Sequence, residues 1–257
     1  MAIITLLTDS GEADHYVAAI KAKILTINPG IKIIDISHKI PACDIGQGAF
    51  VLRSVFRDFP KGTVHLVGIH ATGQKDDACI ATQIEDHYFV GADNGFFGLI
   101  SEKPVQGVVD INSLNPRQST FPEKDILAPA AAKLAAGMKL SDLGKALPAF
   151  KRMTDRHVRA TKKQISGHVI RVDSFGNLIT NIPKEAFEML SKDRTYTLQL
   201  NKEIFKRLYD NYHQVEPGEA LILFNSLGLL EIAVNMGHAA DLFGAGYDSA
   251  VIINFDE

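Results

Sequence analysis

Hydrophobic and polar residues alternate in two different ways along this chain. In its first half, short β-branched runs bounded by Gly, Pro, Asn or Asp alternate with patterns of helical period. The runs predict strands at 3–8, 32–36, 63–68, 78–84, 88–92 and 107–110. The patterns between them predict helices at 14–28, 44–58 and 125–137. Such an order is typical of an α/β domain in which helices cover a mainly parallel sheet.

The pattern changes after a polar and basic stretch at 147–163. Beyond it, short alternating strands are expected at 165–172, 195–200, 220–224, 229–234 and 249–254, with few helical signals, which indicates an antiparallel β domain. The basic stretch is either a solvated linker or an anion-binding arm, and its lack of interleaved aromatic residues favours the linker. We therefore expect an α/β domain at 1–150, a linker at 151–164 with the boundary near residue 155, and a β domain at 165–257.

Composition excludes several classes of protein. The 257 residues are 46% hydrophobic and carry a net charge of -3, so no electrostatic footprint for nucleic acid is present. We expect no membrane span, no signal peptide and a cytoplasmic location. The two cysteines, Cys43 and Cys79, lack the spacing of a zinc site or a disulfide framework and are expected to be small buried residues. His15, His70 and His87 are isolated in sequence, which argues against a metal.

Polar or glycine-containing motifs follow the expected strands directly. The first, Thr8-Asp9-Ser10-Gly11, is followed by Asp14. Acidic side chains at the carboxyl end of a strand in an open α/β sheet are well placed to bind hydroxyl or amino groups. Alternatively, Asp9 belongs to a turn and Asp14 caps the next helix. His38 and His65 lie at strand ends, where a structural hydrogen bond is the favoured interpretation.

Five segments along the chain carry a shared pattern: Thr8-Asp9-Ser10-Gly11 with Asp14, Ile34-Asp35-Ile36-Ser37-His38, Ala92-Asp93-Asn94-Gly95, Phe175-Gly176-Asn177 and Asn225-Ser226-Leu227-Gly228. Taken together, these motifs resemble the family of S-adenosylmethionine (SAM) cleaving proteins that includes the fluorinase, the chlorinase and the adenosine-forming SAM hydrolases. The resemblance implies an α/β N-terminal domain and a β-barrel-like C-terminal domain. It also implies a homotrimer, or a dimer of trimers, with the substrate between the N-terminal domain of one subunit and the C-terminal domain of its neighbour.

The resemblance assigns roles to individual residues. Asp9 matches the carboxylate that binds the ribose hydroxyls, and Asn177 and Phe175 match the amide and the aromatic ring that contact adenine. The methionine end falls to three positions, Asp14, Asp173 and Ser226. The matching motifs add Thr72, Asp93, Asn94, Phe121 and Asn225 to the expected substrate-binding residues. The implied reaction is an in-line displacement at the ribose C5′ in which methionine leaves as a neutral thioether, with SAM as substrate and no cofactor.

The sequence departs from the family where the nucleophile is activated. The hydrolases carry an Asp-Arg-His set, and here His70, Asp76 (or its neighbour) and Pro122 stand at the matching positions. A halogenase is disfavoured, because Glu123 replaces a small residue and a carboxylate about 4 Å from a halide costs roughly 4 kcal/mol at a dielectric near 20.

We hypothesise that His70, Asp76 and Glu123 together orient and deprotonate water. In the opposing interpretation, His70 is a turn residue and Glu123 is a solvated charge at a helix start. The leading function is therefore SAM hydrolysis to adenosine and L-methionine. The alternatives are a catalytically silent SAM or adenosine binder, and an adenosyl transferase that uses another small nucleophile.

Overall fold

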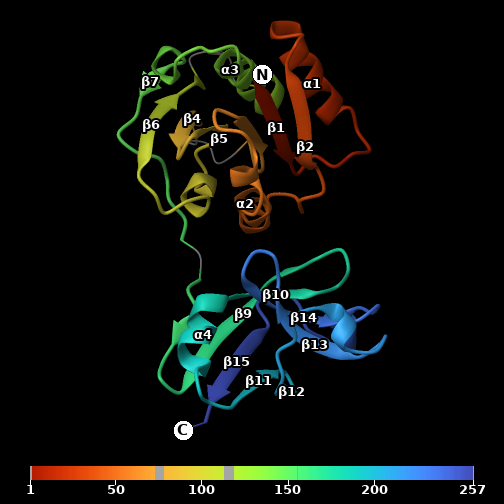
Figure 1. The fold of residues 1–257 in the computed structure, drawn as a ribbon. Helices are drawn as coiled ribbons and strands as arrows, with labels where there is room; N and C mark the ends of the chain where they lie inside the picture. Colours follow the sequence, from red (N-terminus) through yellow and green to blue (C-terminus); the bar gives the residue numbers. More distant parts are fainter. Residues whose placement is uncertain (1, 73–77, 113–118, 155, 257) are drawn as a thin grey trace. The chain divides into compact units, whose positions relative to one another are not determined.

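A computed structural model describes residues 2–72, 78–112, 119–154 and 156–256. The chain divides into two compact units, Met1–Asp155 and Arg156–Glu257 (Figure 1). Each unit has a sheet and a hydrophobic core of its own. The predicted position 76 lies outside the described residues.

The N-terminal unit is built on a mixed sheet that contains the predicted parallel strands. Its strands are β1 (Ile3–Thr8), β2 (Lys32–Ser37), β3 (Val64–Gly68), β4 (Cys79–Ile84), β5 (His87–Ala92), β6 (Val105–Asp110) and β7 (Lys145–Ala146), in the order β2-β1-β3-β5-β4-β6-β7. The neighbours β2, β1, β3 and β5 are parallel, and the antiparallel strands β4, β6 and β7 extend one edge. The fold class expected from the sequence, an α/β unit, is confirmed. The carboxyl ends of β1 and β3 are adjacent, so the loops that follow them meet.

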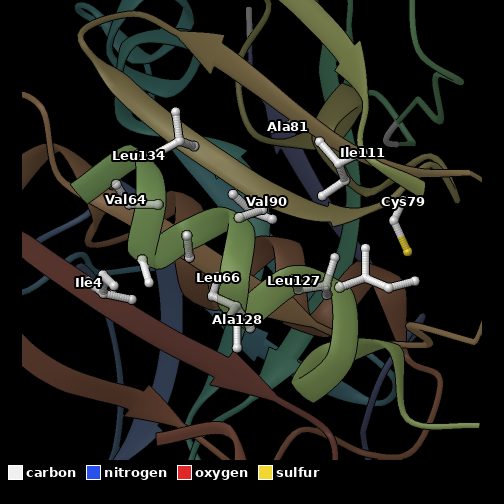
Figure 2. Close-up of a cluster of buried hydrophobic side chains, with 14 of the residues drawn as sticks. Ile4, Val64, Leu66, Cys79, Ala81, Val90, Ile111, Leu127, Ala128 and Leu134 are labelled. Carbon is white, nitrogen blue, oxygen red and sulfur yellow. The ribbon is translucent and has the colours of Figure 1, made fainter. Parts of the chain in front are cut away.

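Helices cover both faces of this sheet. They are α1 (Tyr16–Ile27), α2 (Ile45–Arg53), α3 (Ala128–Ala135), the short turns η1 (Phe56–Asp58), η2 (Phe96–Leu99) and η5 (Leu140–Asp142), and the π-helical turn η4 (Glu123–Leu127). Figure 2 shows Leu127, Ala128 and Leu134 of the η4–α3 segment over β-strand residues such as Ile4 and Leu66. The small alanine side chains let α3 lie close to the sheet, and Pro129 falls in its first turn, as expected.

The first residues of α1 and α2 show whether Asp14 and Asp44 act as helix N-caps. Asp44 is the N-cap of α2, and its side chain accepts a hydrogen bond from the backbone N–H of Gln47 at 2.9 Å, which confirms the prediction. Asp14 does not cap α1: the N-cap position is His15, which makes no side-chain capping bond. The predicted helix at 44–58 is also shorter, since α2 ends at Arg53 and η1 follows separately.

The C-terminal unit is an antiparallel β structure that curls into a barrel-like shape, as expected. Its main strands are β9 (Gln164–Val172), β10 (Leu178–Pro183), β11 (Tyr196–Leu200), β12 (Glu203–Phe205), β13 (Ala220–Phe224), β14 (Leu229–Val234) and β15 (Ala250–Phe255), in the order β12-β11-β15-β9-β10-β14-β13. The short strand β8 (Arg159–Ala160) pairs with β9. Helices α4 (Lys184–Ser191), α5 (Ala239–Phe243) and the turn η6 (Tyr212–Gln214) complete it.

Several sequence expectations need correction here. β10 and α4 were not predicted, and β8 forms a strand within the stretch expected to be a linker. Cys43 is exposed rather than buried, because it occupies a left-handed turn (φ 62°) after β2, whereas Cys79 is buried in β4 as expected. Within the described ranges, no helix is long and apolar enough to cross a membrane.

Candidate functional site

The Asp9 carboxylate joins three loops at the carboxyl end of the parallel strands. Asp9 directly follows β1, and its Oδ2 accepts hydrogen bonds from the backbone N–H of Cys43 (2.9 Å) and of His70 (3.0 Å). Both donors have left-handed backbones, with φ of 62° and 47°. This conformation costs an L-residue about 1–2 kcal/mol, so the two hydrogen bonds offset strain in both turns. Asp9 Oδ1 has no hydrogen-bond partner among the described residues.

Asn94 holds the His70 turn from its other side. Its Nδ2 donates to the carbonyl oxygens of Ile69 (3.0 Å) and His70 (3.3 Å), and its Oδ1 accepts from the N–H of Phe96 (3.2 Å). The neighbouring Asp93 accepts a hydrogen bond from the backbone N–H of Lys151 at 2.7 Å. Asn94 therefore stabilises the His70 turn, and Asp93 holds the segment at Lys151.

Glu123 lies buried against the end of β3. It is the first residue of η4, and its side chain is 9% exposed. A Cβ on Gly68, the last residue of β3, would stand 2.9 Å from Glu123 Cγ, so the glycine makes room for this side chain. Burial raises the pKa of Glu123, and the charge of Asp9 raises it further. Glu123 is therefore not a solvated charge at a helix start.

Two apolar residues accompany Glu123, one coupled to it through its charge and one two positions earlier in the chain. Burial, together with the charge of Glu123, raises the pKa of Cys79 to about 12, so this thiol stays protonated near neutral pH. Phe121 is half-buried, packs against the core and meets the ring of Tyr16 edge-on at a centroid distance of 5.3 Å. Asp9 accepts the His70 N–H, and its charge acts on Glu123, so Asp9 links the other two residues; we call Asp9, His70 and Glu123 the N-terminal cluster below.

Other predicted residues of this unit lie at the surface. Asp14 is exposed in a bend before α1, and Thr72 is exposed in the turn after β3. Asp76 lies outside the described residues, so its relation to the cluster stays a prediction.

A tight turn before β10 positions the predicted adenine-binding residues of the C-terminal unit. Asp173 Oδ1 accepts from the backbone N–H groups of Phe175 and Asn177, both at 2.9 Å. Gly176 has φ 80°, and a Cβ there would lie 2.2 Å from His238 Cγ, so no other residue fits. The turn leaves Phe175 76% exposed, with its ring open to a stacking partner.

A chain of hydrogen bonds connects this turn to a buried carboxylate. Asn177 Nδ2 donates to Asp173 Oδ2 (3.1 Å) and to the hydroxyl oxygen of Tyr212 (3.4 Å). The Tyr212 hydroxyl donates to Glu231 Oε1, and Asn225 Nδ2 donates to Glu231 Oε2 at 3.1 Å. We call these five residues the C-terminal network. The sequence analysis gave no role to Tyr212 or Glu231, although a lone Glu within the apolar strand β14 is a signal that could have singled out the latter.

The turn between β13 and β14 contains two further predicted residues, Asn225 and Ser226. Asn225 Oδ1 accepts from the backbone N–H groups of Leu227 (3.0 Å) and Leu229 (3.2 Å), so its amide is used within the turn. Ser226 is exposed beside it.

The histidines at strand ends are hydrogen-bonded within the core, as expected. His65 Nδ1 lies 2.7 Å from Thr5 Oγ1, and His38 Nδ1 lies 2.8 Å from Thr8 Oγ1. Burial, with a smaller contribution from His87, lowers the pKa of His65 to about 3. Among the described residues, no group of three or more His, Cys, Asp or Glu side chains is arranged to bind a metal ion.

Comparisons with known proteins point to one family. The N-terminal domain model of the SAM hydroxide adenosyltransferases matches residues 4–144, and the C-terminal domain model matches residues 167–252. The chain is 32% identical to the (R)-S-adenosyl-L-methionine hydrolase of Salinispora tropica over 94% of this chain and 93% of that protein. It is 25% identical to a fluorinase of Actinoplanes sp. over 72% of this chain and 73% of that protein.

A solved structure has the same fold over nearly the whole chain. The crystal structure of an uncharacterized conserved protein from Thermotoga maritima superimposes with a TM-score of 0.89 at 32% identity, over 99% of this chain and 100% of that one. Both units and nearly the full length are therefore covered by these matches. The chain belongs to the SAM hydroxide adenosyltransferase family.

Proposed function

We propose that this protein cleaves SAM with water at the ribose C5′ and releases adenosine and L-methionine. The observation that carries the proposal is the N-terminal cluster, in which the charge of Asp9 acts on the buried carboxyl group of Glu123, and Asp9 also holds the strained His70 turn. A buried acid and a strained backbone at the carboxyl ends of parallel strands are features of catalytic sites. The Salinispora tropica relative is an (R)-S-adenosyl-L-methionine hydrolase, which supports the same reaction.

The two units contribute different parts of the substrate site in this proposal. Asp9 binds the ribose hydroxyls through Oδ1, since Oδ2 is occupied by two backbone N–H groups. Phe175 stacks on adenine, and Asn177 hydrogen-bonds its edge. The methionine end falls to Asp14, Asp173 and Ser226; Asp173 Oδ1 accepts two bonds within its own turn and Oδ2 accepts one, so Oδ2 can accept one more.

The remaining predicted residues shape the site. Asp93, Asn94 and Asn225 hold its loops through their hydrogen bonds, and Phe121 and Thr72 remain proposed substrate contacts. We propose that the active protein is a homotrimer in which the N-terminal unit of one subunit and the C-terminal unit of its neighbour enclose each substrate. SAM is the substrate, and the displacement itself requires no redox or group-transfer cofactor.

The chemistry needs a positioned nucleophile more than an acid. The sulfonium charge already activates the leaving group, because methionine departs as a neutral thioether. Water loses a proton as the new C–O bond forms, and a carboxylate with a raised pKa is a stronger base than an ordinary surface carboxylate. Glu123 and His70 are therefore the proposed catalytic pair, with Asp76 as a third member. The negative charge of Glu123 also disfavours a halide as the nucleophile.

The test is turnover of SAM by the purified full-length protein. Adenosine and methionine are separated by chromatography for the wild type, Glu123→Gln and His70→Ala, with Glu12→Gln as a control at an exposed surface acid. We expect the wild type and the control to release both products in equal amounts. Loss of a general base lowers kcat by about 10²–10⁴-fold, so we expect a drop of this size for Glu123→Gln. Unchanged rates in both cluster variants, or tight SAM binding without product, would overturn the proposal.

A further inference from the structure

The C-terminal network contains a buried carboxylate that does not belong to the predicted substrate-binding residues. Glu231 is 4% exposed in β14, between apolar neighbours, and each of its oxygens accepts one hydrogen bond, from Tyr212 and from Asn225. Burying a carboxylate is costly unless it is fully hydrogen-bonded. Its two partners belong to separate loops, so Glu231 connects the loop of Tyr212 to the turn of Asn225.

The direction of each hydrogen bond follows from the chemistry of the groups. A carboxylate can only accept, so the Tyr212 hydroxyl donates its proton to Glu231. Burial and Glu231 both raise the pKa of Tyr212, which keeps the phenol protonated at neutral pH. The Tyr212 oxygen therefore faces Asn177 as an acceptor.

This direction determines how the Asn177 amide is oriented. Two acceptors, Asp173 Oδ2 at 3.1 Å and the Tyr212 oxygen at 3.4 Å, contact the Asn177 side chain, so its NH₂ group must point toward them. Both N–H groups of the amide are then used. Asn177 Oδ1 forms no hydrogen bond with any of the described residues. Because it is also not fully buried, this oxygen is open to a ligand.

We propose that Glu231, acting through Tyr212, is a positioning residue that keeps the Asn177 oxygen facing the ligand and thereby selects purines with an exocyclic amino group. An amide oxygen accepts a hydrogen bond from the amino group of adenine. Hypoxanthine has a carbonyl oxygen at that position, so two acceptors would face each other and no hydrogen bond would form. A site that hydrogen-bonds a ligand group rejects analogues that lack it, because the buried polar group is left unpaired. This inference rests on the proposed function, in which Asn177 contacts adenine.

The test compares the binding of adenosine and inosine by calorimetry in the full-length protein. Tyr212→Phe removes the second acceptor from Asn177 with little change in shape. Glu231→Gln places an amide N–H against the Tyr212 oxygen, so the hydroxyl proton turns toward the Asn177 NH₂ group. Tyr209→Phe is the matched control, because Tyr209 packs on the same small cluster and its hydroxyl has no hydrogen bond in the described part of the chain.

We expect the wild type and Tyr209→Phe to prefer adenosine over inosine by the same factor. In Tyr212→Phe the preference should fall about fivefold, which is the change in a binding constant that corresponds to one ordinary hydrogen bond. In Glu231→Gln the preference should fall by at least as much. Circular dichroism spectra of all variants verify folding. If both network variants bind adenosine and prefer it over inosine by the wild-type factor, this inference is wrong, whereas the proposed function still stands. A wild-type protein that binds neither nucleoside and cleaves no SAM would overturn the proposed function and this inference with it.

Discussion

Replacing Asp9 with Asn should destabilise the N-terminal unit as well as weaken substrate binding. Asp9 Oδ2 accepts two backbone hydrogen bonds, from Cys43 and His70, and both donors are left-handed. A hydrogen bond to a charged acceptor contributes about 1.5–3 kcal/mol, whereas a neutral one contributes about 0.5–1.5 kcal/mol. Loss of the charge at two bonds therefore costs about 2 kcal/mol, after allowance for the partial exposure of Asp9. In a unit of this size, that cost lowers Tm by roughly 4–8 °C.

The assay is urea and thermal unfolding of Asp9→Asn followed by far-ultraviolet circular dichroism. Asp44→Asn is the matched control, because Asp44 accepts one backbone hydrogen bond as the N-cap of α2 and Asn is an equally good cap. We expect a shift of only a few tenths of a kcal/mol for the control. If Asp9→Asn unfolds at the same urea concentration and temperature as the control, Asp9 does not hold the two turns, and the proposed architecture of the N-terminal cluster is wrong.

Two pH effects follow from the buried titratable groups. Burial raises the pKa of Glu123 in the folded protein, so stability falls as the pH rises from the ordinary carboxyl pKa to the raised one, and it stays lower above that. Glu123→Gln should therefore be more stable than the wild type at pH 7 and equally stable at pH 4 in urea unfolding; equal midpoints at both values would contradict the burial argument. Burial lowers the pKa of His65 to about 3, so the folded state binds fewer protons than the unfolded state between about 3 and 6.5. Stability should fall by about 1.4 kcal/mol per pH unit as the pH drops through this window, and His65→Asn should reduce that slope; an identical slope in the variant would show that another group is responsible.

The parallel half of the N-terminal sheet could be predicted because polar or turn-forming residues in the local sequence mark the ends of its strands. β1 coincides with the predicted run because six apolar or β-branched residues end at the polar Asp9 turn. The end of α2 was misplaced, because the apolar pattern continues through Phe56 while the backbone changes to a 3₁₀ turn after Arg53. Periodicity reports which residues are buried, and it does not report how the backbone between them is hydrogen-bonded.

The contacts within the candidate site depend on distant parts of the chain. Glu123 resembles a solvated residue of a helix start in sequence, and its burial depends on the missing side chain of Gly68, 55 positions earlier. The Tyr212–Glu231 pair likewise joins η6 to β14, and nothing local to Tyr212 indicates its partner. The family resemblance provided the ligand-facing motifs, whereas these supporting contacts became visible only with the fold.

The central claim is that water attacks the ribose C5′ of SAM. The most direct measurement is mass spectrometry of the products after the wild-type protein is incubated with SAM in ¹⁸O-labelled water. We expect adenosine and methionine in equal amounts, with one ¹⁸O atom in each adenosine and none in methionine. Unlabelled adenosine, a product in which the adenosyl group is bonded to another nucleophile, or no cleavage at all would contradict the claim.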